Sequence, residues 1–315
     1  MSSVPELQLS PFASDVLSGL LTEGQKKIPP KYFYDDLGSK LFEAITLLPE
    51  YGLSRADSRV LARCGKEVAR HLGSPGLVAE LGSGSGKKTS HILEAISERV
   101  KYYPIDVSRE ALNTCRNELS PLVQVHPIHA EYFEGLHQIA RLRTAGSRML
   151  LLFLGSSVGN FEPEQRDEFF RGLHESLRPG DLFLLGADLV KDVDEMIDAY
   201  DDPTGVTAAF NLNLLSRMNR ELGANFQLKS FTHMTVWNHQ DQRMEMHLVS
   251  RKRQQVLFQS LHASVEFEAG ETIWTESSQK FTPEELDEAA EASGFHVLKT
   301  WMDAEWPFAE TLWQA

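Results

Sequence analysis

The chain has 315 residues, of which 42% are hydrophobic and 24% are charged, proportions that are ordinary for a globular protein with a sizeable core. Its 45 acidic residues outnumber its 31 Lys and Arg residues and give a formal net charge of −14. Because nucleic acids and anionic membranes are bound by clustered Lys and Arg, this charge argues against both as partners. We therefore expect a small-molecule ligand.

Further absences narrow the class of protein. Only two cysteines, Cys64 and Cys115, are present, so neither a disulfide framework nor a zinc site is indicated. The 11 histidines show no metal-ligand spacing, and we expect no metal. No apolar run approaches the ~20 residues of a membrane span, the amino terminus lacks a secretory pattern, and no heptad repeat requires a partner helix. These patterns predict a cytoplasmic monomer.

The amino-terminal part of the chain predicts helices around an aromatic loop. Ser10-Pro11 indicates a helix start, because the serine hydroxyl can cap the helix and proline suits its first position. The aromatic loop follows at 32–36. One further helix is expected to begin at Ser39 and to end before Pro49, and another to span about 56–72.

Strands and helices then alternate. The predicted strands are 77–81, 102–106, 122–128, 148–155 and 181–187, and the predicted helices between them are 87–99, 108–118, 133–143 and 163–176. Five such repeats predict a parallel sheet with helices on both faces. Ligands of such sheets bind at the carboxyl ends of the strands, where Gly82, Asp106 and Gly155 are expected.

The alternation stops near Lys191. Helices at 192–200 and 205–221 are followed by β-rich segments at 226–238, 243–252, 255–267 and 271–279, then by a helix at 283–293 and strands at 295–301 and 309–314. The simplest architecture closes the parallel sheet with an antiparallel carboxyl-terminal pair and interrupts it with an inserted β-rich piece. We expect an α/β domain of residues 57–192 and 281–315 and an α+β domain of residues 1–56 and 193–280.

A glycine-rich turn follows the first predicted strand. Leu77 to Thr89, LVAELGSGSGKKT, is an apolar run broken by glycines at 82, 84 and 86. Glycine lets the backbone turn sharply and approach a ligand, and N–H groups at the next helix start can donate to it. Glu80 precedes the first glycine and Asp106 ends the second strand, as in a βαβ unit that binds a ribose. The segment predicts a nucleotide-like ligand.

Both a dinucleotide and S-adenosylmethionine use such a turn. The turn lacks the G-x-G-x-x-G spacing that positions a pyrophosphate, and Glu80 would repel a diphosphate but attract the ammonium group of a methionine. The late antiparallel pair also suits methyltransferases better than dehydrogenases. We therefore predict a Rossmann-like, S-adenosylmethionine-dependent methyltransferase sheet and a second, substrate-binding α+β domain.

Seven long and unusual blocks are spread over nearly the whole chain. They are FYDDLGS (33–39), LPEY (48–51), ELGSG (80–84), FLGSSVGN (153–160), AYDD (199–202), GVTAAFN (205–211) and TESSQKF (275–281). Together they resemble the histidine-specific Nα-methyltransferase family of ergothioneine biosynthesis. The resemblance implies trimethylation of the α-amino group of L-histidine to hercynine, with three molecules of S-adenosylmethionine consumed.

The resemblance also implies which residues bind the cofactor. Gly82, Lys88 and Asp106 match the family's cofactor positions, with Asp106 on the ribose hydroxyls. The acid-aromatic pair that holds the adenine in relatives is Glu131-Tyr132 here instead of Asp-Phe, which keeps the chemical type but changes the reach.

Substrate positions follow in the same way. The family grips the imidazole with a carboxylate and a hydroxyl, which match Glu276 and Ser278; these residues are two apart in a predicted strand and therefore share a face. The other matches to substrate-contacting positions are Met246, Tyr51 and Phe42 around the ring, Asn160 and Tyr200 on the substrate carboxylate, and Tyr34 and Gly155, as catalytic candidates, around the amino group.

Purely structural interpretations, without any ligand, are also open for these residues. Glu276 and Ser278 could form a solvated strand face, and Met246 and Phe42 could be core. The segment Gly52-Leu53-Ser54-Arg55 replaces a Tyr-Pro-Thr-Arg of some relatives, which puts substrate affinity in doubt. Two other functions stay open, namely a relative that methylates tryptophan or tyrosine and a non-catalytic sensor of an amino acid or of S-adenosylmethionine. A larger apolar ring would leave Glu276 buried without its partner, which favours histidine.

Overall fold

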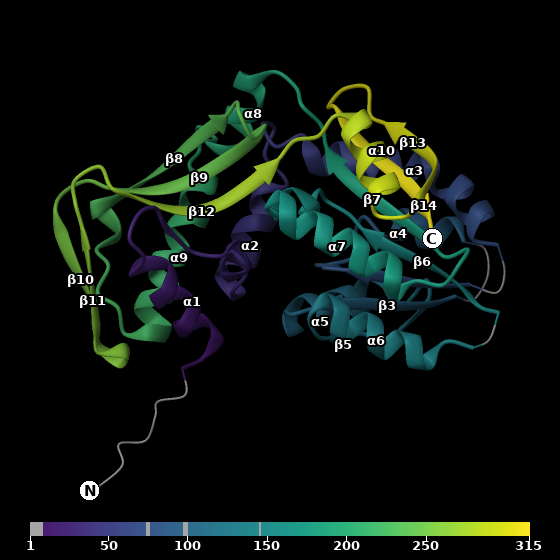
Figure 1. The fold of residues 1–315 in the computed structure, drawn as a ribbon, viewed down its shortest axis with the longest axis horizontal. Coiled ribbons are helices and arrows are strands. Elements are labelled where there is room, and N and C mark those ends of the chain that lie inside the picture. Colours follow the sequence, from purple (N-terminus) through teal and green to yellow (C-terminus); the bar gives the residue numbers. More distant parts are fainter. Residues whose placement is uncertain (1–8, 74–75, 97–99, 145) are drawn as a thin grey trace, which may run out of the picture. The chain divides into compact units, whose positions relative to one another are not determined.

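The structure, a computed structural model, describes residues 9–73, 76–96, 100–144 and 146–315 (Figure 1). The chain divides into two compact units. The first unit is Met1–Glu50, Val193–Asn238 and Met244–Ser277; the second is Tyr51–Asp192, His239–Arg243 and Ser278–Ala315. Residues 51–56, 239–243 and 278–280 therefore belong to the second unit, whereas the sequence predicted them to be part of the α+β domain.

The second unit is built on an eight-stranded sheet with the order β13-β14-β7-β6-β2-β3-β4, in which β5 also pairs with β3. The strands are β2 (Gly76–Leu81), β3 (Lys101–Asp106), β4 (Gln124–Val125), β5 (Ile128–His129), β6 (Arg148–Phe153), β7 (Leu182–Asp188), β13 (His296–Met302) and β14 (Phe308–Gln314). Strands β2 to β7 pair in parallel, whereas β14 is antiparallel to β7 and β13 is antiparallel to β14. The predicted α/β architecture, a mostly parallel sheet closed by an antiparallel carboxyl-terminal pair, is confirmed.

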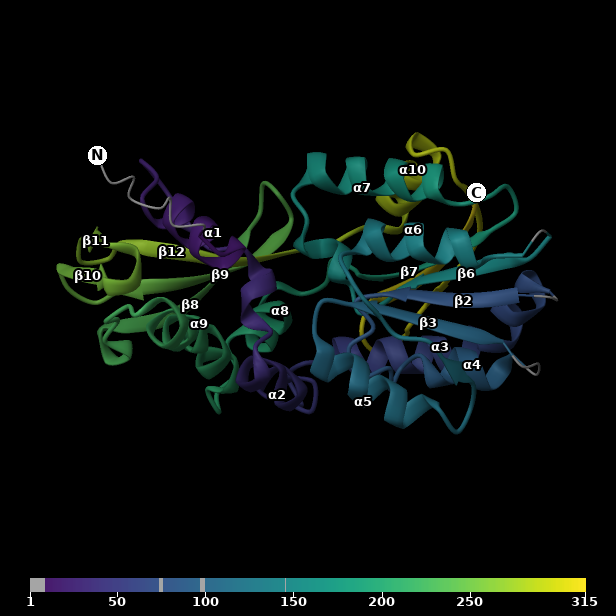
Figure 2. The ribbon, with the colours of Figure 1, turned by 90° about the horizontal axis from the view of Figure 1, so that it is seen from below.

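Helices cover both faces of this sheet, as parallel strands require. They are α3 (Leu53–Leu72), α4 (Ser90–Ala95), α5 (Arg109–Leu119), α6 (Tyr132–Leu142), α7 (Pro163–Ser176) and α10 (Pro283–Ala292). Figure 2 shows α6, α7 and α10 on one face and α3, α4 and α5 on the other. Each face has its own buried cluster of apolar side chains.

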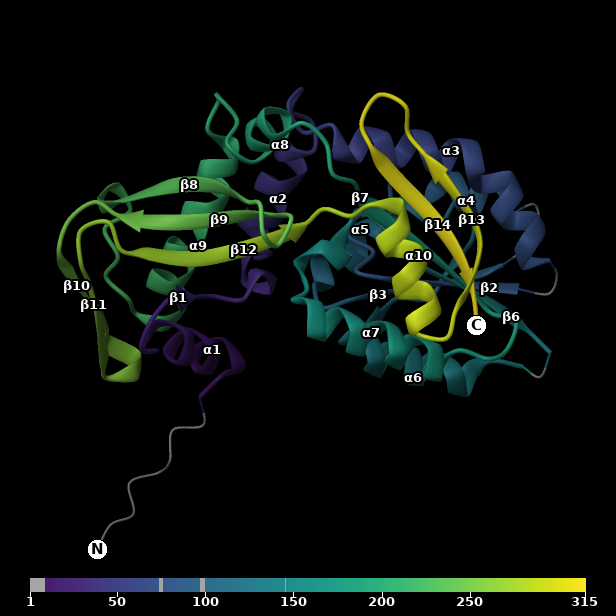
Figure 3. The same cartoon turned by 45° about the horizontal axis from the view of Figure 1, so that its top comes forward.

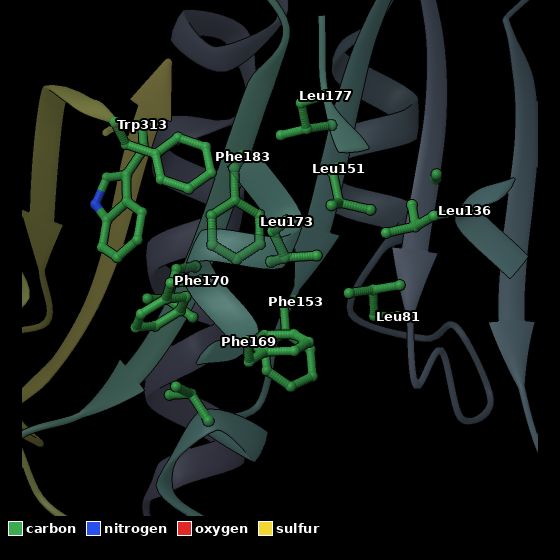
Figure 4. Close-up of a cluster of buried hydrophobic side chains, with 14 of the residues drawn as sticks. Leu81, Leu136, Leu151, Phe153, Phe169, Phe170, Leu173, Leu177, Phe183 and Trp313 are labelled. Carbon is green, nitrogen blue, oxygen red and sulfur yellow. The ribbon is translucent and has the colours of Figure 1, made fainter. Parts of the chain in front are cut away.

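The core under α7 is rich in aromatic rings (Figure 4). The Phe153 ring of β6 lies 5.2 Å from that of Phe169, and the Phe170 ring lies 5.0 Å from the indole of Trp313. Phe183 of β7 packs edge-on against the same indole. These contacts join α7 to the central strands and to the antiparallel strand β14. Each Å² of apolar surface that they bury stabilises the fold by about 25 cal/mol.

The first unit contains a four-stranded sheet with the order β1-β12-β9-β8 and a two-stranded hairpin of β10 and β11 (Figure 3). Its strands are β1 (Lys26–Lys27), β8 (Phe231–Asn238), β9 (Arg243–Ser250), β10 (Gln254–Phe258), β11 (Ala263–Phe267) and β12 (Thr272–Gln279). Its helices are α1 (Pro11–Leu20), α2 (Asp36–Ile45), α8 (Val193–Tyr200) and α9 (Val206–Leu222).

Side-chain caps explain where several helices begin. Ser10 Oγ accepts the Ala13 amide at 3.2 Å at the start of α1, as the sequence predicted. Asp35 Oδ1 accepts the Gly38 amide at 2.7 Å, which starts α2 before the expected Ser39. Thr282 and Glu285 form a reciprocal capping box at the start of α10.

The structure corrects or refines the sequence predictions at three elements. The expected strand 122–128 is two short strands, because Pro127 between them has no N–H for the ladder. The predicted β-rich segment 255–267 forms the hairpin of β10 and β11, which turns at η4 (Gln259–Leu261) with His262 in a left-handed conformation. The expected helix 87–99 is reduced to α4, and residues 97–99 lie outside the described residues.

Among the described residues, no helix is long and apolar enough to cross a membrane. Within the same residues, no group of His, Cys, Asp and Glu side chains is arranged to hold a metal ion.

Candidate cofactor and substrate sites

The glycine turn after β2 has the backbone that only glycine adopts easily. Gly82, Gly84 and Gly86 have φ values of 64°, 52° and 73°. A Cβ on Gly86 would lie 2.7 Å from Leu119 Cδ1 and 2.8 Å from Cys115 Sγ, so a side chain there would collide with α5. The turn is thus fixed by both backbone conformation and packing.

Asp106 lies at the end of β3 beside this turn. Its Oδ2 accepts the Gly84 amide at 3.1 Å and its Oδ1 accepts the Ser108 amide at 2.8 Å. Burial raises the pKa of Asp106, and the backbone N–H groups oppose that rise. A carboxylate has about four acceptor positions, so these two bonds orient the group and leave acceptors for hydroxyls of a ligand.

Glu80 is bound within the protein. It is 3% exposed, and its Oε2 accepts hydrogen bonds from Thr89 Oγ1 at 2.7 Å and from the Tyr102 hydroxyl. Burial raises its pKa to about 7, although both hydroxyl donors act in the opposite direction. Glu80 therefore ties β2 to β3 and to the segment before α4, in addition to any attraction for a cationic ligand.

Lys88 and Gly155 are brought together by a residue that the sequence analysis did not identify. Asp57 of α3 is fully buried, and its Oδ2 accepts the Gly155 amide at 3.1 Å and pairs with Lys88 Nζ. Gly155 has a φ of 74°, and a Cβ there would lie 2.9 Å from Lys88 Nζ. The only sequence signal for Asp57 is an acid placed on the apolar face of a predicted helix.

The acid-aromatic pair lies at the start of α6. Glu131 is the exposed N-cap residue of that helix. The Tyr132 hydroxyl would lie 3.2 Å from a Cβ on Gly82, and the Tyr132 ring packs edge-on against Phe153 at 5.6 Å. Burial raises the pKa of Tyr132. The structure therefore brings Tyr132 to the glycine turn, next to the position of Gly82.

The loop after β6 carries Asn160 at the end of η2 (Ser157–Asn160). Gly155 and Ser156 are both left-handed, and Ser156 Oγ accepts the Asp188 amide at 2.9 Å, which holds the turn to β7. A Cβ on Gly159 would lie 2.8 Å from the Gln279 carbonyl oxygen and 3.5 Å from Ser278 Oγ. Asn160 therefore follows a glycine that packs directly on the segment of Ser278.

Ser278 is anchored by a buried charge network. Lys280 Nζ donates to Ser278 Oγ at 2.9 Å and pairs with Asp188 Oδ2 at 2.9 Å. Lys191 Nζ pairs with Asp188 Oδ1 at 2.7 Å, and the Trp306 indole N–H donates to the same oxygen at 2.9 Å. The two ammonium groups keep the pKa of Asp188 below its usual value despite burial.

Tyr51 is a buried residue of the second unit and directly precedes the segment Gly52-Leu53-Ser54-Arg55. A Cβ on Gly52 would lie 2.1 Å from Cε3 of Trp306. Glycine at position 52 therefore leaves room for the indole ring of Trp306, which occupies the space of a side chain.

In the first unit, Tyr34 and Phe42 belong to an aromatic cluster with Phe210 of α9. The Tyr34 and Phe42 rings are 5.6 Å apart, and each lies about 6 Å from Phe210, at 5.9 Å and 6.0 Å. Tyr34 is 36% exposed and Phe42 is half-buried. The rings of this cluster pack against one another in edge-on and tilted arrangements, which fixes their orientation.

Tyr200 is held by histidine and threonine side chains of β8. His233 Nε2 and Thr235 Oγ1 donate to the Tyr200 carbonyl oxygen at 2.8 Å and 3.0 Å. The Asn211 amide donates to His233 Nδ1 at 2.9 Å, which fixes the ring tautomer. Burial lowers the pKa of His233. The neutral ring thus positions the carboxyl end of α8.

Met246 and Glu276 lie on the neighbouring strands β9 and β12. Met246 is 2% exposed, and Thr275 Oγ1 donates to its carbonyl oxygen at 2.9 Å. Met244 and Leu248, which share its face of the strand, are also buried. Glu276 is half-buried, and its carbonyl oxygen accepts the Trp274 indole N–H at 2.9 Å.

Residues 12–315 match the family model described as histidine-specific methyltransferase, SAM-dependent. The histidine N-alpha-methyltransferase of Mycobacterium tuberculosis (strain CDC 1551 / Oshkosh) is 40% identical to this chain over 304 residues, which cover 95% of this chain and 93% of that protein. The protein of the same name from Mycolicibacterium smegmatis is 39% identical over the same shares.

Ergothioneine biosynthesis protein 1 of Neurospora crassa is 32% identical over 206 residues, which cover 64% of this chain and 24% of that longer protein. The family model and both mycobacterial proteins match almost the whole chain, including the glycine turn, the loop after β6 and the segment of Glu276 and Ser278. The chain therefore belongs to the histidine-specific, S-adenosylmethionine-dependent methyltransferase family.

Proposed function

We propose that this protein transfers methyl groups from S-adenosylmethionine to the α-amino group of L-histidine, three times in succession, and so forms hercynine, the first step of ergothioneine biosynthesis. The observation that carries the proposal is the nearly full-length similarity to histidine N-alpha-methyltransferases. The sites of both units are compatible with it.

The residues around the glycine turn fit S-adenosylmethionine. Asp106 has acceptors left for the ribose hydroxyls, and Lys88 carries the charge that suits the carboxylate of the cofactor, its only anionic group. Glu131-Tyr132 at the start of α6 would take the adenine, with Gly82 beneath Tyr132. When bound, the cofactor supplies an electrophilic methyl group on a sulfonium.

We assign recognition of the imidazole to Glu276 and Ser278, with Met246, Tyr51 and Phe42 around the ring. The Lys280 ammonium donates to Ser278 Oγ, which supports a hydroxyl that offers its own proton to a ring nitrogen, while Glu276 accepts the other ring N–H. Asn160 and Tyr200 would hold the substrate carboxylate. The anchoring of the Tyr200 backbone by His233 and Thr235 supports that role.

The chemistry needs a neutral amine aligned with the methyl group, so the main contribution of the site is positioning. Tyr34 and Gly155 are assigned to the surroundings of the amino group, and Tyr34, or a water held by it, is the candidate that accepts the amine proton. The final product carries a permanent cation. The pocket must therefore tolerate a growing positive head group, which aromatic faces such as Tyr34 and Phe42 can do.

The decisive experiment combines binding and product analysis. Calorimetry with L-histidine and S-adenosylhomocysteine is expected to show a ternary complex, and mass spectrometry after reaction with S-adenosylmethionine is expected to show gains of one, two and three methyl groups. Binding without methylated product would indicate a sensor, and faster methylation of tryptophan or tyrosine would indicate a relative with another substrate.

We further propose a monomer that acts in the cytoplasm. Light scattering after size exclusion tests the oligomeric state, and localisation of the tagged protein tests the compartment.

A further inference from the structure

A buried carboxyl group with no role so far lies behind the cofactor residues of the second unit. Glu310 of β14 is 0% exposed, as is Asp57 of α3. A Cβ on Gly186 would lie 2.7 Å from Glu310 Oε1 and 3.2 Å from the Gly155 amide nitrogen. Glu310 Oε1 and the Gly155 amide therefore both lie against Gly186, and Asp57, which binds that amide, is also a neighbour of Glu310.

The two carboxyl groups present acceptors to each other. Within the described part of the chain, three carboxylate oxygens of this pair accept no hydrogen bond: Glu310 Oε1, Glu310 Oε2 and Asp57 Oδ1. Two adjacent ionised carboxylates in a site closed to water would repel each other and would lack the donors that buried charges need. A proton held by one of the two carboxyls removes both costs, because it becomes the missing donor.

The surroundings decide which carboxyl holds the proton. Asp57 Oδ2 already accepts from Lys88 Nζ and the Gly155 amide, so the charge of Asp57 is compensated. The titratable groups that face Glu310 are Asp57 and the Cys64 thiol of α3, Lys88 before α4, and Glu80 of β2. Burial and the charges of Asp57 and Glu80 raise the pKa of Glu310 well above its usual value, and Lys88 alone opposes them.

We propose that Glu310 is a positioning residue of the cofactor site, which stays protonated, donates its hydrogen bond to Asp57 Oδ1 and thereby fixes the pair of Lys88 and the Gly155 amide on Asp57 Oδ2. Lys88 then faces one negative charge, that of Asp57, instead of two. Its ammonium group can therefore still attract the anionic end of a ligand. An ionised Glu310 would draw Lys88 back into the protein and weaken that attraction. The proposal rests on the assignment of Lys88 to the S-adenosylmethionine carboxylate.

Three variants separate donor chemistry from packing. Glu310→Gln keeps an N–H donor for Asp57 and carries no charge at any pH. Glu310→Leu fills the site without a donor. Thr311→Val changes the next residue of the same strand, whose side chain is buried and bonded to Thr300 at 2.9 Å, and serves as the matched control.

The readout is the affinity for S-adenosylhomocysteine, measured by calorimetry on the full chain without histidine. We expect Glu310→Gln and Thr311→Val to stay within about threefold of the natural protein, and Glu310→Leu to bind about tenfold more weakly or worse, as loss of a hydrogen bond to a charged group implies. Lys88→Met should show the same loss, and adding Glu310→Leu to it should cost little more, because the two residues act in one chain of contacts.

Infrared spectroscopy tests the proton directly. The natural protein at neutral pH should show the carbonyl band of a buried carboxylic acid that Glu310→Gln removes and Thr311→Val keeps. Absence of that difference band, or an affinity of folded Glu310→Leu equal to that of the natural protein, overturns the proposal. If Glu310→Leu does not fold, the infrared difference and the Glu310→Gln affinity decide alone.

Failure of the wider assignments looks different. A natural protein that does not bind S-adenosylhomocysteine at all would contradict the proposed function, and a Lys88→Met variant with full affinity would contradict the assignment of Lys88. Normal histidine methylation together with an indifferent Glu310→Leu variant would reject the role of Glu310 alone.

Discussion

Replacing Asp188 by asparagine tests whether the buried charge network under Ser278 stabilises the second unit. Asp188 is 1% exposed, and its two lysine partners, Lys280 and Lys191, have side chains that are 0% and 2% exposed. Asparagine preserves the shape and one acceptor oxygen for the Trp306 indole N–H, but it removes the carboxylate charge that pairs with both buried ammonium groups.

The size of the expected loss of stability follows from the removal of that carboxylate charge. Removing one partner of a buried ion pair costs about 3–5 kcal/mol, whereas an exposed pair contributes little. We therefore expect Asp188→Asn to lower the free energy of unfolding by about 3–5 kcal/mol, which moves a urea midpoint by about 1 M or more for a slope of about 3 kcal/mol/M. Adding Lys280→Met to Asp188→Asn should restore part of the lost stability, because it removes one of the two ammonium groups that paired with Asp188.

Urea unfolding followed by circular dichroism measures these changes. Lys299→Gln, which breaks the exposed pair of Lys299 with Glu67 at 2.8 Å, is the control and should leave the midpoint unchanged within error. A loss below about 1 kcal/mol for Asp188→Asn, or a further loss in the double variant, would refute the reasoning that Asp188 neutralises both lysines.

Three other predictions follow from the sites. Because burial raises the pKa of Glu80 to about 7, its contribution to stability is complete below its unfolded pKa of 4.5 and is lost as the pH rises through about 7. The stability of the natural protein relative to Glu80→Gln should therefore fall by about 2–3 kcal/mol between about pH 5 and about pH 8 in chemical denaturation, and a constant difference would show that Glu80 is not perturbed. The double change Glu276→Ala with Met246→Val should lower kcat/KM for histidine about tenfold or more and admit tryptophan in steady-state assays; undiminished histidine kinetics would sink the imidazole assignment. Tyr34→Phe should lower kcat at least about tenfold with a smaller effect on KM, and full rates for all three methylations would remove Tyr34 from proton transfer.

The parts of the fold and of the site that the sequence predicted are local in the chain. The turn at Gly82, the acid at the end of β3 and the helix capped by Ser10 each depend on a few consecutive residues, and the structure contains them as expected. The antiparallel order of the last strands was also predictable, because the alternation of strands and helices ends before them.

What the sequence missed depends on contacts between distant segments. Asp57 and Glu310 are 0% exposed, yet an acid within a helix or a strand usually predicts a solvated face, so neither could be recognised without the fold. The two-residue strand β1 is too short to give a periodic signal, and it is defined only by parallel pairing of Lys26 and Lys27 with Ile273 and Trp274. His262 in a left-handed conformation lacks the usual glycine, which hid the turn between β10 and β11.

The positions of the two thiols make the protein its own reporter of local opening. Cys64 and Cys115 are the only cysteines of the chain, both are buried, and both belong to the second unit, on α3 and α5. Burial raises the pKa of Cys115 to about 12 and that of Cys64 as well, so neither is a thiolate at neutral pH. The rate at which an alkylating reagent labels the native protein therefore measures how often the helices on one face of the large sheet detach, with no engineered cysteine needed and no signal from the first unit. A ligand that binds at the glycine turn, where Cys115 packs against Gly86, should slow that labelling.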